Sequence, residues 1–295
     1  MKIYIEYKFE EGAWGGGNQF LKNLRNEFEN RKILSNFSDA NFILFNSHQN
    51  FKKIISLKNH DSRKLFIHRV DGPMRLYNKM SDNRDHIVYD LNSKIADGTV
   101  FQTKWSYESN LSLGMNPTKN YDIIQNACDP EIFFKKNTKN KTEKIRIIST
   151  SWSNNINKGF NTYKYLDNNL DFDKYEYVFA GNSPFEFNNI KKLGALHSKD
   201  LAEELRKSDI YITASKNDPC SNSLIEAISC GLTCYALDSG GHPEILNNNN
   251  YLFENEESIL KILDKISEVP ESSLLGDDIS DITDQYISFF KKIRK

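Results

Sequence analysis

Short apolar runs alternate along this chain with longer stretches in which apolar residues recur at helical spacing. The runs are rich in β-branched and aromatic residues, and polar loops bound each of them, which favours β-strands. Strands that alternate with helices are typical of an α/β fold with parallel sheets. In the first half of the chain, strands are predicted at residues 3–7, 42–45, 64–68, 98–102 and 122–125.

A polar segment at residues 135–144 interrupts this alternation. It has no apolar period and is predicted to be a linker between two domains. Helices are predicted at residues 18–30, after the first strand, and at residues 279–293, near the C-terminus. A second α/β series follows the linker, with strands predicted at residues 145–150, 177–180, 210–213 and 233–237.

The length of 295 residues accommodates two Rossmann-like domains of ordinary size. We place these domains at residues 1–135 and 136–276, and we expect a C-terminal helix within residues 277–295 to pack back on the first domain. Hydrophobic residues make up 38% of the chain, which is enough for ordinary cores.

The charge balance and the cysteine content limit the kinds of partner and the cellular compartment that are expected. The 39 basic and 40 acidic residues nearly cancel, whereas a protein that binds nucleic acid electrostatically normally carries a basic stripe. No run approaches the roughly 18 apolar residues that span a bilayer, and the N-terminal residues resemble a strand rather than a signal peptide. The four cysteines form no CxxC pair and are too sparse for a disulfide framework. These features predict a cytoplasmic protein with reduced cysteines that does not bind nucleic acid.

The most informative segment begins at residue 215 and ends at residue 246. Two carboxylates in it, Asp218 and Glu226, are separated by seven residues that form a polar loop and the start of an apolar helix. This helix is predicted to begin near residue 221 or 222 and to end at Gly231, a natural C-cap. A strand then leads into a Gly240-Gly241 turn that opens a second helix.

This segment resembles the donor-binding signature, written Glu-x7-Glu, of the retaining glycosyltransferases with the GT-B fold (family 4 type, glycosyl transferases group 1). The resemblance implies two Rossmann-like α/β domains whose mostly parallel sheets face a central cleft. It implies an enzyme that moves a hexose or related sugar from a nucleoside diphosphate donor to a glycan, lipid or other hydroxyl acceptor, with retention of anomeric configuration. No cofactor and no catalytic metal are expected, because the Asp171-Phe172-Asp173 triplet is interpreted as a solvated loop before a strand.

In the resembled family, the residue that matches Glu226 holds the ribose hydroxyls, and the residue that matches Asp218 approaches the transferred sugar. Lys158 matches a cation that holds the diphosphate. The Arg expected a few residues earlier is absent, and Trp152 and Ser153 stand in its place. Lys158 and helix dipoles are therefore expected to carry more of the leaving-group charge.

Further donor contacts are expected from backbone groups. The Gly240-Gly241 turn permits close approach of a ligand. His242, which follows this turn, is interpreted either as facing the donor or as an exposed turn residue. The other positions assigned to donor binding by the resemblance are Ser153, Gly181, His197, Cys220, Ser221 and Asn222.

A second group of candidates lies in the first half of the chain. The run Gly15-Gly16-Gly17 follows the first strand and is predicted to form a flexible loop, which the resemblance places at the cleft. His68, Arg69 and Asp71 lie at the end of a predicted strand, where ligands of open α/β sheets bind. Arg69 would support a phosphate, and His68 or Asp71 would hold a sugar or acceptor hydroxyl during catalysis. The alternative interpretation is an Asp-Gly turn with a core histidine.

Two other functions are open on the sequence. Asp218 in place of Glu, together with the absent Arg, is compatible with a non-catalytic sugar- or nucleotide-binding protein that retains the GT-B shape. A sugar-nucleotide epimerase or a phosphorylase on the same fold fits the motifs less well. The sequence does not specify the base and sugar of the donor, the acceptor, or peripheral association with a membrane.

Overall fold

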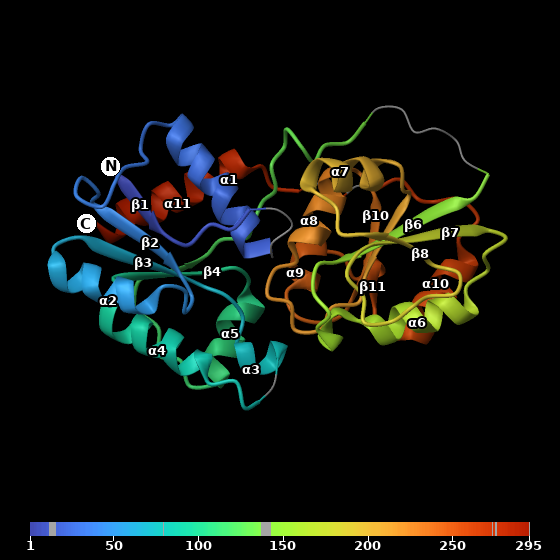
Figure 1. Cartoon of the computed structure of the whole chain (residues 1–295), viewed down its shortest axis with the longest axis horizontal. Helices are drawn as coiled ribbons and strands as arrows, with labels where there is room; N and C mark the ends of the chain where they lie inside the picture. The colour runs from blue at the N-terminus through green and yellow to red at the C-terminus, as the bar shows by residue number, and fades with distance from the viewer. Residues whose placement is uncertain (12–15, 79, 137–142, 273, 275, 295) are drawn as a thin grey trace. The chain divides into compact units, whose positions relative to one another are not determined.

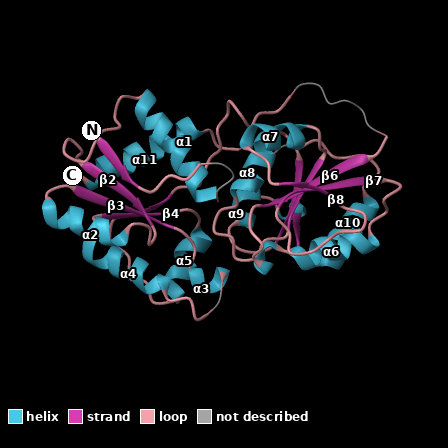
Figure 2. Cartoon of the chain, viewed as in Figure 1, coloured by secondary structure: helices cyan, strands magenta, loops and turns pink. Residues whose placement is uncertain are grey.

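The computed structural model describes residues 1–11, 16–78, 80–136, 143–272, 274 and 276–294. The chain forms two compact units, and in each of them helices cover a parallel sheet (Figures 1 and 2). The first unit comprises Met1–Glu10, Asn18–Asn126 and Asp277–Lys295, and the second is built mainly from Ala127–Gly276. The predicted α/β class with parallel sheets is confirmed.

The sheet of the first unit has the strand order β1-β2-β3-β4-β5, and all of its described pairings are parallel. The five strands predicted for this half of the chain are all present, each within two residues of its predicted ends. Their bounds are β1 (Ile3–Glu6), β2 (Phe42–Asn46), β3 (Leu65–Val70), β4 (Gly98–Phe101) and β5 (Tyr121–Ile123).

Helices cover both faces of this first sheet. After α1, a single parallel bridge joins Leu34 to Ile3, so the chain passes the outer edge of β1 before it returns to β2. This detour places α1 on the face opposite α2 and α4 (Figure 1). The C-terminal α11 lies on the same face as α1, where Phe290 stacks on Phe42 at a centroid distance of 5.2 Å. The helices are α1 (Gly16–Asn30), α2 (Phe51–His60), α3 (Met74–Tyr77), α4 (Arg84–Ile95), α5 (Lys104–Ser112) and α11 (Ile279–Ile293).

The sheet of the second unit has the order β11-β10-β9-β6-β7-β8, again with parallel pairings. The four predicted strands are confirmed, whereas β8 and β11 were not predicted. The first of these is rich in Lys and the second has two residues, so neither carries a period of alternating apolar residues. The strands are β6 (Ile145–Ser151), β7 (Tyr175–Gly181), β8 (Lys191–Gly194), β9 (Ile210–Thr213), β10 (Thr233–Leu237) and β11 (Leu252–Phe253).

Two apolar cores fill the two faces of the second sheet. One core takes buried side chains from α7 and α8, among them Leu205 and Leu224, and the other takes Leu166 from α6 and Leu263 from α10. Burial of each such side chain stabilises the fold by about 1.5–3 kcal/mol before entropy is counted. The helices are η1 (Ile156–Lys158), α6 (Phe160–Asn169), α7 (Ser198–Arg206), α8 (Asn222–Ser229), α9 (His242–Leu246), η2 (Asn249–Tyr251) and α10 (Glu256–Lys265).

The strand order creates a switch point between β6 and β9. From β6 the chain proceeds outward through β7 and β8, and it then returns to β9 on the other side of β6. The connections that leave the carboxyl ends of these two neighbours therefore run in opposite directions. A crevice forms at such a point, and ligands of open α/β sheets bind there.

Asp167 anchors the loop that leads into β8. Its side chain is completely buried near the end of α6 and accepts hydrogen bonds from the backbone N–H groups of Asn188, Asn189 and Ile190, and from Lys164. Burial opposes ionisation, but these donors outweigh it and hold the pKa of Asp167 below its ordinary value. The carboxylate thus fixes the backbone of this loop next to the end of α6.

Replacing Asp167 with Ala is expected to lower the free energy of unfolding by roughly 2–4 kcal/mol, because buried N–H groups lose a charged acceptor. Since the pKa is lowered in the folded state, this stabilisation is present above about pH 4 and is lost as the pH falls through the folded-state value. Urea titrations at neutral and acidic pH measure the difference. The exposed Asp173 gives the control: Asp173→Ala should change stability by less than about 0.5 kcal/mol, and equal losses in both variants would refute the anchoring role.

Candidate functional site

An ion pair spans the switch point of the second sheet. Lys158 follows β6, Asp218 follows β9, and the Lys158 Nζ lies 3.0 Å from the Asp218 Oδ2. Both side chains are largely buried, with 15% and 12% of their surface exposed. Burial alone would raise the pKa of Asp218, but the charge of Lys158, the neighbouring His242 and the backbone N–H of Cys220 outweigh it and hold this pKa below its ordinary value. The pair therefore presents an ionised carboxylate and an ammonium group where a ligand is expected.

Two glycines let the loops that carry this pair approach one another. Gly159 has φ +85°, and a Cβ at this position would lie 2.3 Å from the carbonyl oxygen of Ala214 at the end of β9. Gly240 has φ +64°, and its Cβ would lie 2.3 Å from the carbonyl oxygen of Asp218. The next residue, Gly241, donates its N–H to that same oxygen at 2.9 Å. Glycine is required at both positions because any side chain would meet backbone atoms.

Glu226 lies in the second turn of α8, partly buried. Burial raises the pKa of its carboxyl to about 8. Among the residues that the structure describes, no hydrogen bond or ion pair reaches this carboxyl group. A partly buried carboxyl with a raised pKa and no partner is a common sign of a functional site, and this one suits a ligand that brings its own hydroxyl donors.

The remaining sequence-predicted donor residues lie on the loops that follow the strands of the second sheet. Ser151 is the last residue of β6, and its Oγ donates a hydrogen bond to the carbonyl of Ser153 at 2.8 Å. Gly181 is the last residue of β7 and lies next to the carbonyl of Ser151. Cys220 and Ser221 are buried beside Asp218, and Asn222 begins α8. His197 is the exposed N-cap residue of α7, beyond β8.

His242 is not an exposed turn residue, which was one of its two interpretations. It is completely buried, and its Nδ1 lies 2.8 Å from the carbonyl oxygen of Leu237. Because a carbonyl only accepts, Nδ1 carries the proton. Burial lowers the pKa of His242, although the negative charge of Asp218 acts to raise it. Sequence reasoning missed this burial because nothing in a Gly-Gly-His-Pro turn indicates that the turn packs against the Asp218 backbone.

His68 lies in the core of the first unit. It is completely buried in β3, stacks on Phe45 at a centroid distance of 4.3 Å, and has Nε2 3.0 Å from the Ser47 carbonyl and Nδ1 3.2 Å from the Asn92 amide. Burial lowers its pKa to about 4. The structure thus corresponds to the alternative of a core histidine rather than to a catalytic group at a strand end.

The buried Arg69 and the partly buried Asp71 form a polar network at the carboxyl ends of β2, β3 and β4. Arg69 is completely buried and donates to Asp71 at 2.9 Å and to Asn126 at 2.7 Å. The Asp71 Oδ2 also accepts from Asn46 and Ser47, each at 2.9 Å. These bonds compensate the Arg69 charge, which would be costly to bury alone. Much of the hydrogen-bonding capacity of both side chains is thus used inside the unit.

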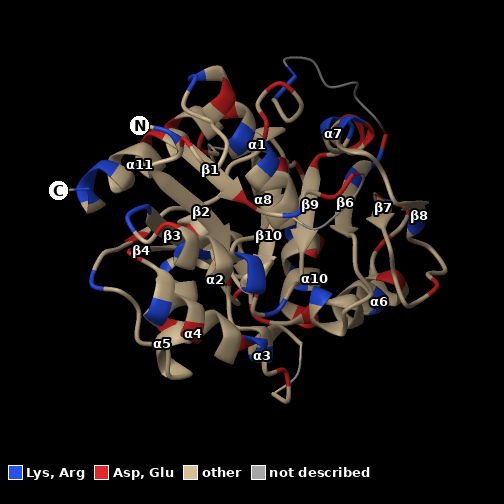
Figure 3. Ribbon diagram, turned by 60° about the vertical axis from the view of Figure 1, so that its left-hand side comes forward, with Lys and Arg blue, Asp and Glu red and all other residues tan. Residues whose placement is uncertain are grey.

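The glycine run is only partly described. Gly15 lies outside the described residues, and Gly16 and Gly17 lie in the first turn of α1 rather than in the predicted flexible loop. Within the described ranges, no three His, Cys, Asp or Glu side chains are grouped so that they could hold a metal ion. None of the helices in these ranges combines the length and the apolar composition that a bilayer-spanning segment needs. Lys and Arg positions are interspersed with Asp and Glu positions along the ribbon (Figure 3).

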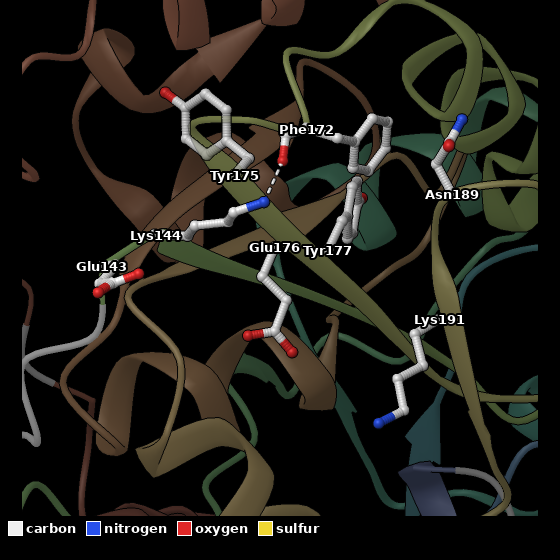
Figure 4. A pocket seen from close by; sticks show the side chains of 8 residues that line it. All are labelled: Glu143, Lys144, Phe172, Tyr175, Glu176, Tyr177, Asn189 and Lys191. Carbon is white, nitrogen blue, oxygen red and sulfur yellow. Dashed lines mark hydrogen bonds between the residues drawn. The ribbon is translucent and has the colours of Figure 1, made fainter.

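A cavity of about 710 Å³ lies at the opposite end of the second sheet from the ion pair. Its walls come from the amino ends of strands, since Tyr175 begins β7 and Lys191 begins β8. Lys144 donates to the carbonyl of Phe172 at 2.7 Å on its rim (Figure 4). Ligands of open α/β sheets bind at carboxyl ends, so this cavity is separate from the candidate site. It is lined by Glu143, Lys144, Phe172, Tyr175, Glu176, Tyr177, Asn189 and Lys191.

Comparison with known proteins relates the second unit to one sequence family. The family model described as glycosyl transferases group 1 matches residues 130–281. The phosphatidylinositol N-acetylglucosaminyltransferase GPI3 subunit of Saccharomyces cerevisiae is 28% identical over 96 residues, which cover 28% of this chain and 21% of the subunit. The chain therefore matches about a fifth of the length of that relative.

Solved structures are similar over nearly the whole chain. Sucrose-phosphate synthase from Thermosynechococcus elongatus has a TM-score of 0.75 at 11% identity, covering 99% of this chain and 98% of that chain. HepE from Anabaena, in complex with UDP-glucose, has a TM-score of 0.69 at 12% identity, covering 99% and 97%. At these identities the similarity concerns the fold, and it confirms the predicted GT-B architecture.

Replacing Glu226 with Gln is expected to make stability less dependent on pH. The raised pKa means that the folded wild type holds one proton more than the unfolded chain between about pH 4.5 and pH 8. Wild-type stability therefore falls as the pH rises through this window, and the variant escapes that loss. Its melting temperature relative to wild type should increase from pH 5 to about pH 8.5. Glu131→Gln, at an exposed position, is the control. A melting-temperature difference between Glu226→Gln and wild type that stays constant with pH would disprove the raised pKa of Glu226.

Proposed function

The chain belongs to the glycosyl transferases group 1 family, and we propose that it transfers a sugar from a nucleoside diphosphate donor to a hydroxyl of a glycan, a lipid or another acceptor. The observation that carries the proposal is the Lys158–Asp218 ion pair at the β6–β9 switch point. Glu226 supports it, because its carboxyl follows on the adjacent helix and has no protein partner among the described residues.

Each side chain has a separate task in the proposed reaction. Lys158 neutralises the diphosphate as negative charge develops on the leaving group. Glu226 accepts hydrogen bonds from the ribose hydroxyls, and Asp218 accepts from a hydroxyl of the transferred sugar. Backbone N–H groups next to Gly240 and Asp218 approach the ligand closely because the turn has no side chain there. Lys158 takes the place that a metal ion occupies in other phosphate sites, so we propose a metal-independent reaction.

The proposed transfer retains the anomeric configuration. The bond between the anomeric carbon and the diphosphate oxygen breaks, and the acceptor oxygen bonds to the same face of that carbon. The acceptor proton passes to the departing diphosphate. Protein groups then act mainly by stabilising the developing charge and by positioning the substrates. The buried Lys158–Asp218 pair is suited to this role.

Relatives guide the choice of donor. The name of the GPI3 subunit describes N-acetylglucosamine transfer to phosphatidylinositol, and HepE was solved with UDP-glucose. We therefore propose a UDP-sugar as the donor to test first. A non-catalytic sugar-nucleotide-binding protein is the second candidate, favoured by Asp218 in place of the family Glu and by Trp152 and Ser153 where an Arg is expected.

A thermal-shift panel of UDP-, GDP-, ADP- and CMP-sugars tests the proposal. One class of nucleoside diphosphate sugar is expected to raise the melting temperature selectively, because a ligand that binds only the folded state stabilises it. Release of the nucleoside diphosphate in the presence of glycan or lipid acceptors then separates an enzyme from a binding protein. Stabilisation without any turnover would favour the binding protein, and no stabilisation by any donor would refute both functions.

Two substitutions should separate the parts of the donor site. Glu226→Ala is expected to weaken the binding of UDP and of uridine alike by roughly 1–3 kcal/mol, because the ribose loses its hydrogen bonds to the carboxyl group. Lys158→Met is expected to weaken the binding of UDP by a similar amount and to leave the binding of uridine unchanged, because only the diphosphate contacts the ammonium group. Calorimetric titration measures both. Glu131→Ala and Lys199→Met, at exposed positions, are the controls. Weaker binding of uridine by Lys158→Met would contradict the assignment of Lys158 to the diphosphate alone.

A further inference from the structure

His242 contains a buried nitrogen with no hydrogen-bond partner. Its Nδ1 donates to the Leu237 carbonyl, so Nε2 carries the lone pair. That Nε2 is buried and makes no hydrogen bond within the part of the chain that the structure describes. Buried polar atoms are nearly always satisfied, and an exception needs an explanation. This one lies beside the residues assigned to the donor, in the first turn of α9.

Charged groups at and near the Lys158–Asp218 ion pair act on the protonation of His242 in opposite directions. Burial disfavours the protonated ring most strongly, and Lys158 opposes protonation as well. Asp218 and Asp238 favour protonation, and the hydrogen bond to Leu237 also favours it. Burial is therefore the main cause of the neutral state of His242. The ammonium group of Lys158, 3.0 Å from Asp218, adds to it by offsetting the carboxylate charge that favours protonation of the imidazole.

Donor binding changes this balance if the proposed function is correct, and the inference rests on that function. A diphosphate attracts Lys158 and shares its charge, which leaves a buried carboxylate with less compensation. An uncompensated buried charge is strongly unfavourable. The diphosphate also adds negative charge to the site, which favours a cation nearby.

We propose that His242 is a charge-compensating residue that takes up one proton at Nε2 when a nucleoside diphosphate engages Lys158. The proton comes from solvent, and the N–H bond forms on the lone pair of the neutral ring. The imidazolium then holds Asp218 ionised and in position while Lys158 serves the leaving group. His242 does not touch the reacting atoms in this scheme and acts through Asp218.

Calorimetric titration of UDP in buffers of different ionisation enthalpy measures the proton count directly. At about pH 7.5, wild type is expected to take up between about 0.5 and 1 proton more than His242→Asn, whose amide retains a donor for the Leu237 carbonyl. The wild-type affinity for UDP should also fall with rising pH more steeply than that of the variant, by up to about tenfold per pH unit. Uridine, which lacks the diphosphate, should show no difference in proton uptake between the two proteins.

The exposed His60 provides the matched control, and His60→Asn should take up as many protons as wild type. UDP binding with equal proton uptake in wild type and His242→Asn would overturn the inference and leave the proposed function standing, because the proton would then reside on Asp218 or another group. Absence of binding by UDP, GDP and ADP would overturn both proposals.

Discussion

Strands β6 and β9 are neighbours in the second sheet, and this adjacency brings Lys158 to within 3.0 Å of Asp218 although 60 positions separate them in sequence. The pair is possible because two glycines allow the loops to touch. Gly159 approaches Ala214, and Gly240 approaches the backbone of Asp218. Every other group of the candidate site is positioned relative to these loops, so the strand order of the sheet is the constraint on which the site depends.

Two carboxyl groups in this site have opposite electrostatic environments. Asp218 is buried next to a cation and backbone donors, which lower its pKa, whereas Glu226 is buried without such a partner, and its pKa rises to about 8. Groups driven apart in this way are suited to different tasks. Asp218 is thus ionised and paired with Lys158, whereas no hydrogen bond or ion pair reaches the Glu226 carboxyl among the described residues.

The first unit holds similar residue types in a different setting. Arg69 and Asp71 lie at strand ends, where a site is expected, but their hydrogen bonds connect β2, β3 and β4 to one another. A buried charge such as that of Arg69 is tolerated where charged and polar partners compensate it. His68, stacked on Phe45 and neutral, belongs to the same core. Residue type and position at a strand end therefore do not predict how many of a side chain's hydrogen bonds are made within the protein.

The sequence by itself determined the α/β class, nine of the strands, the C-terminal helix Ile279–Ile293 and the spacing of Asp218 and Glu226, because periodicity, caps and motifs are local properties. It did not determine β8 and β11, whose short polar or truncated runs carry no period. Only the tertiary structure decided that Lys158 pairs with Asp218, that His242 is buried beside them, and that His68 lies in the core. Burial and charge pairing depend on strand order and on close backbone contacts between distant segments, and a local pattern contains neither.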